Sequence, residues 1–307
     1  MKILVFTEKP FAPAAVKAIQ NVINAAGEDM VLVERGTRQD LLQAVKDVEG
    51  LIVRSDIVDE EVIAAAPKLK VVVRAGAGYD NIDLKSATEH GICVMNTPGQ
   101  NSNAVAELVF GMIVMMCRNK YNGTSGSELK GKSLGIYAFG QVGRNVARIA
   151  KGFGMNIKAL DVFVADDVMI EQDVIPVHDV NVLFSENDFV SLHIPATPET
   201  RHSIGYDLIV KMPKNGVLVN TARKEIIDED GLLKALEERP DLRYVSDIKP
   251  DKAEEFEKRF AERVFFTPKK MGAQTGEANF NAGVAAAEQT IAYLKDGWNK
   301  YQVNKCK

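Results

Sequence analysis

Short apolar runs alternate with longer stretches of helical periodicity along the first third of the chain. The run Lys2–Phe6 precedes Ala12–Ala26, where apolar residues recur at helical spacing before a stop at Gly27. The alternation continues through three more apolar runs and two helical stretches: Val31–Val33, Asp40–Val48, Leu51–Val53, Asp59–Ala66 and Val71–Val73. Strands that alternate with helices in this way predict a doubly wound parallel sheet.

A second series of the same kind begins after a long helix. The turn-rich stretch Asn96–Gln100 leads into an apolar helix at Asn103–Cys117, and the polar, aperiodic segment Asn119–Lys132 is typical of a loop. Six further apolar runs follow: Leu134–Ala138, Ile157–Leu160, Phe189–His193, Val217–Asn220, Arg243–Val245 and Val264–Phe266. The charged run Lys252–Arg263 predicts a solvated helix, and Gly276–Leu294 predicts a final one. We therefore expect two α/β domains.

Composition favours a globular protein of the cytoplasm. No apolar run approaches the roughly 20 residues that cross a bilayer, and the first residues are typical of a strand rather than of a secretion signal. The net charge of −4 argues against general nucleic-acid binding. Three scattered cysteines (Cys93, Cys117 and Cys306) and four histidines lack the spacing of metal ligands. We expect reduced thiols and no metal site.

The segment Ala138–Gly143 resembles a dinucleotide-binding loop with alanine in place of its first glycine. It follows a strand-like run and opens a helical one, so backbone amides of Gly140, Gln141, Val142 and Gly143 are expected to face a pyrophosphate. Alanine serves at the first position if its φ is negative. The alternative is a tight turn without a ligand.

Asp161 stands at the end of the next predicted strand, 21 residues after Gly140. This is close to the spacing of the acid that holds the ribose hydroxyls of a dinucleotide. A carboxylate there repels a 2′-phosphate, so the pattern favours NAD over NADP. The alternative is an exposed aspartate at a turn.

Two arginines end neighbouring predicted strands. Arg54, followed by Ser55, ends one apolar run, and Arg74 ends the next, followed by a glycine-rich loop that begins at Ala75-Gly76. Ligands of α/β proteins bind at the carboxyl ends of parallel strands, and guanidinium groups beside free amides suit a phosphate or carboxylate. We predict an anion pocket from Arg54, Ser55, Arg74 and Gly76; the alternative is a pair of surface ion-pairing residues.

At these residues the sequence resembles the D-2-hydroxyacid dehydrogenase family. The resemblance spans nearly the whole chain and rests on several motifs in order: RAGAGYDNID (74–83), NTPGQNSNAVAEL (96–108), ELKGKSLGIYAFGQVG (128–143), SLHIPATPET (191–200), NTARKEIIDEDGL (220–232) and TPKKMGAQT (267–275). Within the family, Arg54-Ser55 together with Arg74 resembles the subgroup that acts on phosphoglycerate.

The resemblance implies two doubly wound parallel-sheet domains, with a Rossmann NAD domain inserted into a flavodoxin-like substrate domain. Residues 1–95 and 277–307 would form the substrate domain, and residues 96–276 the NAD domain. It further implies a homodimer formed through the NAD domain. Because the chain ends soon after the last family helix, we expect no C-terminal regulatory domain.

The resemblance also implies roles for individual residues. Asp247 matches the residue that holds the nicotinamide amide, and Thr221 and Ala222 match backbone contacts to the cofactor. Arg223 matches the arginine that grips the substrate's carboxylate and carbonyl. Ala77 and Pro195 match further cofactor contacts. His193, beside the cofactor, is expected to be structural.

The chain departs from the family where the acid–base pair is expected. Lys269 follows Thr267-Pro268 where the family has a histidine, and Lys252 stands at the position of its glutamate partner. Lys224-Glu225 also replace two glycines. Either the protein is inactive, or Lys269 exchanges the proton; the neighbouring Lys270 competes for this role and ranks second, because Lys269 directly follows Thr267-Pro268. We favour the second explanation: a lysine must lose affinity for its proton to act near neutral pH, which burial and a neighbouring cation such as Arg223 promote and a carboxylate opposes.

The sequence therefore predicts NAD-dependent oxidation of a small phosphorylated 2-hydroxy acid. Two alternatives stay open. One is a reductase of another 2-keto acid, such as glyoxylate or hydroxypyruvate. The other is a non-catalytic NAD-sensing protein that keeps the fold without turnover.

Overall fold

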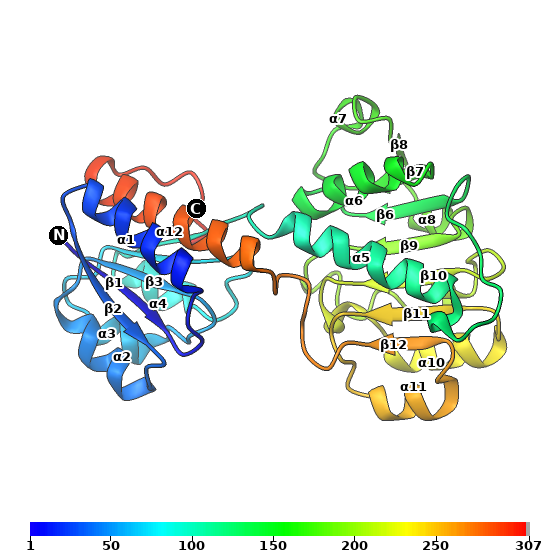
Figure 1. The fold of residues 1–307 in the computed structure, drawn as a ribbon, viewed down its shortest axis with the longest axis horizontal. Helices are drawn as coiled ribbons and strands as arrows, with labels where there is room; N and C mark the ends of the chain where they lie inside the picture. The colour runs from blue at the N-terminus through cyan, green and yellow to red at the C-terminus, as the bar shows by residue number, and fades with distance from the viewer. Residues whose placement is uncertain (305–307) are drawn as a thin grey trace. The chain divides into compact units, whose positions relative to one another are not determined.

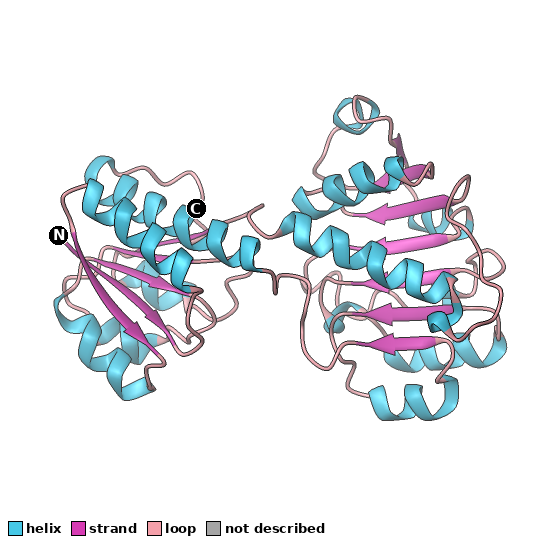
Figure 2. Cartoon of the chain, in the orientation of Figure 1, coloured by secondary structure: helices cyan, strands magenta, loops and turns pink. Residues whose placement is uncertain are grey.

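The computed structural model describes residues 1–304 and divides the chain into two compact units. One consists of Met1–Asn101 and the stretch that begins at Gln274, and the other of Ser102–Ala273. Figure 1 traces the chain from one unit to the other and back, and Figure 2 shows parallel strands flanked by helices in each. No helix among these residues has the length and apolar character needed to cross a membrane.

The first unit is built on a five-stranded parallel sheet with the order β2-β1-β3-β4-β5, the flavodoxin-like order. Its strands are β1 (Lys2–Thr7), β2 (Asp29–Glu34), β3 (Gly50–Val53), β4 (Val71–Arg74) and β5 (Cys93–Asn96). Its helices are α1 (Pro13–Ala25), α2 (Arg38–Ala44), α3 (Glu60–Ala64), α4 (Leu84–Glu89) and α12 (Gly276–Asp296), with a 3-10 turn η1 (Val45–Asp47).

Alternation along β1 explains why helices cover both faces of this sheet. Ile3 and Val5 pack with apolar residues of α1 and α12, whereas Leu4 and Phe6 belong to the core beneath α2 and α3. The C-terminal helix α12 therefore completes the core of a domain whose sheet comes from the start of the chain. Thr275 caps α12, because its hydroxyl oxygen accepts from the amide of Ala278 at 3.1 Å.

The second unit carries a seven-stranded parallel sheet with the order β12-β11-β10-β9-β6-β7-β8. The strands are β6 (Ser133–Tyr137), β7 (Asn156–Leu160), β8 (Ile175–Pro176), β9 (Phe189–Leu192), β10 (Val217–Asn220), β11 (Arg243–Ser246) and β12 (Val264–Phe266). The six strands from β8 to β11 follow the strand order of a Rossmann fold, and β12 adds a seventh strand beside β11. The prediction of two doubly wound parallel-sheet domains is confirmed.

Helices cover both faces of this second sheet as well. They are α5 (Ser102–Cys117), α6 (Gln141–Gly152), α7 (Asp166–Ile170), α8 (Val180–Ser185), α9 (Tyr206–Ile209), α10 (Glu229–Glu238) and α11 (Ala253–Phe260), with 3-10 turns η2 (Asn119–Tyr121) and η3 (Lys224–Ile226). One buried core lies beneath α5 and α6, and the other beneath α9 to α11. Cys93 and Cys117 are buried, and Cys306 lies outside the described residues.

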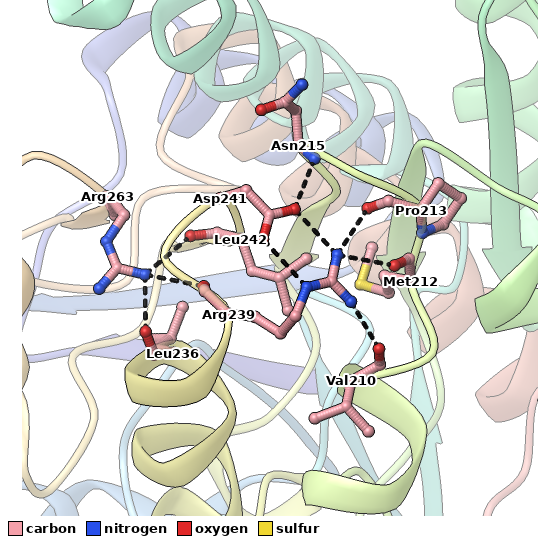
Figure 3. A network of polar contacts seen from close by, with 9 residues as sticks. All are labelled: Val210, Met212, Pro213, Asn215, Leu236, Arg239, Asp241, Leu242 and Arg263. Carbon is pink, nitrogen blue, oxygen red and sulfur yellow. Dashed lines mark hydrogen bonds and ion pairs between the residues drawn. The ribbon is translucent and has the colours of Figure 1, made fainter.

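A polar network ties the loops before β10 and β11 together (Figure 3). The Arg239 guanidinium holds both carboxylate oxygens of Asp241, at 2.9 and 2.8 Å, and also donates to the carbonyl oxygen of Val210 at 2.7 Å. The amide of Asn215 donates to Asp241 as well. The bidentate guanidinium holds the pKa of Asp241 well below its usual range.

Two strands were missed by the sequence analysis. β5 (Cys93–Asn96) was hidden because its short apolar run merges with the turn residues that follow it. β8 has only two residues and pairs at the sheet edge with β7. The charged run near residue 252 does form a helix, α11, but Phe256 and Phe260 anchor one of its faces in the core.

Candidate functional site

Most of the predicted cofactor residues follow the carboxyl ends of the strands in the seven-stranded sheet. The loop after β6 carries Gly140 to Gly143, and Asp161 directly follows β7. Pro195 lies after β9, Thr221 to Arg223 after β10, Asp247 after β11, and Lys269 after β12. In a parallel sheet all of these ends lie at one edge, which is where such sheets bind ligands.

The β6–α6 turn has the geometry of a dinucleotide loop. Gly140 is the N-cap of α6, and no side chain caps the helix, which leaves its first amides available to an anion. A Cβ on Gly143 would lie 2.3 Å from the carbonyl oxygen of Ala138, so only glycine fits there. This close approach explains why a glycine is needed where α6 packs on β6, as predicted for Gly143.

The backbone angle φ of Ala138 differs from the expected one. Alanine was expected to serve at this position with a negative φ, but its φ is 79°, in the left-handed region. The amide of Ala138 donates to the carbonyl oxygen of Leu160 at 2.8 Å, which attaches the turn between β6 and α6 to the end of β7. The loop therefore keeps its glycine-type conformation and imposes it on a residue with a Cβ.

Asp161 joins the end of β7 to the glycine loop. One carboxylate oxygen accepts from the amide of Phe139 at 2.7 Å, and the other accepts from the amide of Phe163 at 2.8 Å. The side chain is thereby oriented beside the start of α6. Its contact with a ribose remains a prediction.

Asn220, at the end of β10, holds the turn that carries three predicted site residues. Its side-chain oxygen accepts from the amide of Ala222, and its nitrogen donates to the carbonyl oxygen of Arg223, both at 2.9 Å. The Arg223 guanidinium donates to the carbonyl oxygen of Ala222 at 2.9 Å. The buried hydroxyl of Thr221 has no hydrogen-bond partner in the part of the chain that the structure describes.

Asp247 is fully buried and has one oxygen available to a ligand. Its Oδ2 accepts from the amide of Gly272 at 2.7 Å, and its Oδ1 has no hydrogen-bond partner among residues 1–304. Burial raises the pKa of this carboxyl, against the opposing effects of the Gly272 amide, Lys270 and Arg223. A buried acceptor without a donor fits the amide of a nicotinamide, as the sequence predicts.

Lys269 and Lys270 follow β12 and differ in their surroundings. Lys269 is exposed, so the burial that the sequence hypothesis required is not provided; its place in a loop beyond the strand end explains this. The hydroxyl of Thr267 lies within hydrogen-bond distance of the carbonyl oxygens of Asp247 and Lys269, at 2.8 and 2.7 Å. The ammonium group of Lys270 donates to the carbonyl oxygen of Ala222 at 3.0 Å.

Two other lysines that stand where the family has different residues form ion pairs with aspartates. Lys252, at the place of the family glutamate, forms an ion pair with Asp230. Lys224 forms one with Asp251 at 2.5 Å. Neither pair includes Lys269 or Arg223.

His193 is held in its neutral form. Its Nε2 lies 2.9 Å from the hydroxyl oxygen of Ser191, and burial lowers the pKa of its ring to about 3. A ring with this pKa stays neutral near pH 7 and takes up a second proton only at much lower pH, which supports the structural role expected for it.

In the five-stranded unit the structure brings Arg54, Arg74 and Gly76 together. Nε of Arg74 donates to the carbonyl oxygen of Arg54 at 2.9 Å. A Cβ on Gly76 would lie 1.5 Å from a guanidinium nitrogen of Arg74, so this arginine depends on the glycine. Ser55 is exposed at the end of β3, and the carbonyl oxygen of Ala77 accepts from Asn96 at 2.6 Å.

Neutral acceptors position the Arg54 guanidinium. It donates to the carbonyl oxygens of Lys9 and Pro10, at 2.9 and 3.0 Å, and to the side-chain oxygen of Asn279 at 2.5 Å. It also lies over the ring of Phe11, 5.1 Å from the ring centroid. The charge is thus oriented without a direct ion pair in these contacts.

Sequence reasoning did not identify three residues that shape these sites, and it ranked Lys270 behind Lys269. The three are Asn220, Gly272 and Asn279. Asn220 carried a signal, because a polar residue that ends a buried strand needs a partner. The others act through contacts between segments far apart in sequence, for which no local signal exists.

Comparison with known proteins agrees with this arrangement. Residues 106–269 match the family described as "D-isomer specific 2-hydroxyacid dehydrogenase, NAD binding domain". The chain is 39% identical over 274 residues to D-3-phosphoglycerate dehydrogenase of Methanocaldococcus jannaschii, covering 84% of this chain and 52% of that protein. It is 36% identical to hydroxypyruvate reductase of Thermotoga maritima, covering 84% and 88%. The chain thus spans about half the length of the first relative.

Among solved structures, the chain is similar to NAD⁺-bound 3-phosphoglycerate dehydrogenase of Entamoeba histolytica. The TM-score is 0.90 at 47% identity, and the match covers 100% of this chain and 99% of that one. D-lactate dehydrogenase from Escherichia coli, at 25% identity and a TM-score of 0.80, shares the fold.

Proposed function

The chain belongs to the D-isomer specific 2-hydroxyacid dehydrogenase family, whose NAD-binding domain it contains, and we propose that it is an NAD-dependent D-3-phosphoglycerate dehydrogenase. It would oxidise 3-phosphoglycerate to 3-phosphohydroxypyruvate, a step of serine biosynthesis. The observation that carries the choice of substrate is the hydrogen bond from Nε of Arg74 to the backbone carbonyl oxygen of Arg54, which joins the ends of β3 and β4 where both arginines stand. Two guanidinium groups there suit a phosphate better than the uncharged end of glyoxylate or hydroxypyruvate.

The described residues fit NAD. The uncapped start of α6 would hold the pyrophosphate, Asp161 the ribose hydroxyls, and Oδ1 of Asp247 the nicotinamide amide. Bound NAD supplies the hydride acceptor at its nicotinamide C4. The protein's part is to orient the C2 hydrogen of the substrate toward that carbon.

Arg223 and Lys269 would carry the polar part of the reaction. As the C2–H bond breaks, the hydroxyl oxygen becomes a carbonyl oxygen and gives up its proton to the amine nitrogen of Lys269. In the reverse direction, protonated Lys269 returns that proton to the alkoxide oxygen. Arg223 polarises the same oxygen and stabilises negative charge on it. Arg54, Ser55, Arg74 and Gly76 would hold the distal phosphate, and this remote binding orients C2.

A substrate panel tests the proposal. NADH oxidation is measured with 3-phosphohydroxypyruvate, hydroxypyruvate and glyoxylate. We expect the highest kcat/KM with the phosphorylated keto acid. Replacement of Arg54 by alanine should raise KM for that substrate and leave KM for hydroxypyruvate nearly unchanged. A higher kcat/KM for glyoxylate, or an unchanged KM in the Arg54→Ala variant, would refute the assignment of the substrate.

The lysine is tested separately. Lys269→Ala should lower kcat by at least about a hundredfold, the usual contribution of a general base, and leave NADH affinity unchanged. Wild-type turnover in this variant would remove Lys269 from the mechanism. NADH binding without turnover on any keto acid would favour the non-catalytic NAD-sensing alternative.

We also propose that the protein acts as a homodimer in the cytoplasm. The support is the family resemblance for the dimer and, for the compartment, the scattered cysteines of the sequence. Size-exclusion chromatography with light scattering tests the dimer.

A further inference from the structure

The Arg54 guanidinium is held by two parts of the five-stranded unit that lie far apart in sequence. Its Nη1 donates to the carbonyl oxygens of Lys9 and Pro10, at 2.9 and 3.0 Å, and its Nη2 donates to the side-chain oxygen of Asn279 at 2.5 Å. The first two acceptors precede α1, whereas Asn279 belongs to α12 and stands 225 residues after Arg54. The direction of this guanidinium therefore depends on α12.

The side chain of Asn279 is itself held in one orientation. Its Nδ2 donates to the carbonyl oxygen of Thr275, the N-cap residue of α12, at 2.8 Å. Because the amide nitrogen is engaged there, the amide oxygen faces the guanidinium, and the two contacts agree on which atom is which. Further along the same helix, Ala282 and Ala286 are buried in the core of the unit. The acceptor for Arg54 is thus attached to a helix that the core fixes in place.

The three acceptors are uncharged, so they orient the positive charge of Arg54 without cancelling it. Asp56 is the carboxylate that acts on this charge, but its two oxygens accept from the backbone amides of Glu8 and Arg54, at 2.7 and 3.1 Å. Burial lowers the pKa of the guanidinium and Asp56 raises it, and an arginine keeps its proton in either case. A carboxylate in place of the Asn279 amide would form a direct ion pair instead.

One edge of the guanidinium is not used by these contacts. Among residues 1–304, none of the hydrogen bonds from Arg54 to its three acceptors involves Nε. Nε and the adjacent hydrogen of Nη2 form one edge of the planar fork, and two parallel N–H groups match two oxygens of a phosphate. Because Asn279 holds Nη2, it sets the direction of this edge. The Arg54 side chain is half-buried, which leaves part of it accessible to a solute.

We propose that Asn279 is a positioning residue that sets the preference for a phosphorylated substrate. It directs one edge of the Arg54 guanidinium toward the phosphate and, as a neutral acceptor, leaves the charge of Arg54 available to that phosphate. This inference rests on the proposed function, which supplies the phosphorylated 2-hydroxy acid. Asn279 acts through Arg54 and has no part in hydride or proton transfer.

Two probes that differ only in the phosphate, 3-phosphoglycerate and glycerate, test this role. Their Kd values are measured by isothermal titration calorimetry on the full chain saturated with NADH, which cannot accept a hydride from either ligand. The preference is the Kd of glycerate divided by the Kd of 3-phosphoglycerate. The variants are Asn279→Asp, Asn279→Leu and a control, Asn281→Asp, at an exposed residue of the same helix. Circular dichroism checks that each variant is folded.

We expect Asn279→Asp to lower the preference at least about tenfold, as for loss of a hydrogen bond between charged groups, because the new carboxylate pairs with Arg54. Asn279→Leu has a similar size and leaves the charge but not the acceptor, so the preference should fall by about two- to tenfold, the cost of ordering a long side chain on binding. Asn281→Asp adds the same charge away from Arg54 and should stay within about twofold of wild type.

A wild type that favours 3-phosphoglycerate together with an unchanged preference in Asn279→Asp would overturn the inference and leave the proposed function standing. An equal loss of affinity for both probes would overturn it as well, because it indicates a structural role. A wild type that binds both probes equally would refute the phosphate assignment, and this inference with it. If the wild type transfers no hydride but its preference depends on Asn279, the positioning role stands and the dehydrogenase proposal fails.

Discussion

Ala138→Gly should stabilise the protein, because the turn holds this alanine at a φ of 79°. A residue with a Cβ is disfavoured in the left-handed region by about 1–2 kcal/mol, and glycine is not. Glycine also gives the unfolded chain more conformational freedom, and this lowers the free energy of unfolding by about 0.4–1 kcal/mol. The difference predicts an increase of about 0.5–1 kcal/mol in the free energy of unfolding.

Urea unfolding followed by circular dichroism measures this change. The matched control is Ala147→Gly, in the same βα unit but inside α6 and nearly fully buried. It should lower the free energy of unfolding by about 1 kcal/mol, the helix-propensity difference between the two residues. NADH affinity of Ala138→Gly should not fall, since the loop keeps its conformation. Destabilisation by Ala138→Gly, as large as that of the control, would refute the reasoning.

Three further predictions concern half-buried and buried side chains. His193 has a pKa of about 3 when folded against about 6.5 unfolded, so protons favour the unfolded chain and stability falls as the pH drops below about 6.5. Between pH 7 and pH 5 this lowers the free energy of unfolding by about 2 kcal/mol. In urea titrations at several pH values, His193→Gln should lack that part of the pH dependence. An unchanged dependence of the free energy of unfolding on pH would contradict the assignment. Arg239→Met removes the bidentate contact of Figure 3 and should lower the free energy of unfolding by about 2–3 kcal/mol near pH 7. The effect should be smaller below about pH 4, where Asp241 is protonated in the unfolded chain while Arg239 still keeps its pKa low in the wild-type fold; an unchanged thermal midpoint at pH 7 would count against it. Gly272→Ala places a Cβ 2.7 Å from Asp247 and should weaken NADH binding about tenfold, which calorimetry detects; unchanged affinity would exclude Asp247 from the nicotinamide site.

The fold was predictable because alternating strand and helix patterns leave few topologies for a chain of this length. Strands were recognised where an apolar run stands apart from its neighbours, as at Leu51–Val53 or Val217–Asn220. β5 was missed because pattern alone does not separate a short buried strand from an adjoining turn. The two-residue β8 is defined by its pairing with β7 and has no signal of its own.

The site was predictable where a residue's role depends on its place at a strand end. Asp161 belongs to this group, whereas Arg223 and Asp247 were assigned by the family resemblance; the structure puts all three beyond the ends of strands in one sheet. The conformation of Ala138 was not predictable, because the turn imposes a backbone angle that the residue itself disfavours. The contact of Lys270 with Ala222 depends on tertiary packing between two loops, which spacing along the chain does not reveal.

Transfer of deuterium from the cofactor tests the central claim most directly. The protein is mixed with 3-phosphohydroxypyruvate and NADH that carries deuterium on both hydrogens of its nicotinamide C4, and the product is analysed by mass spectrometry and NMR. The account predicts D-3-phosphoglycerate with one deuterium at C2. Bound cofactor that keeps its deuterium, with the keto acid unchanged, would contradict it.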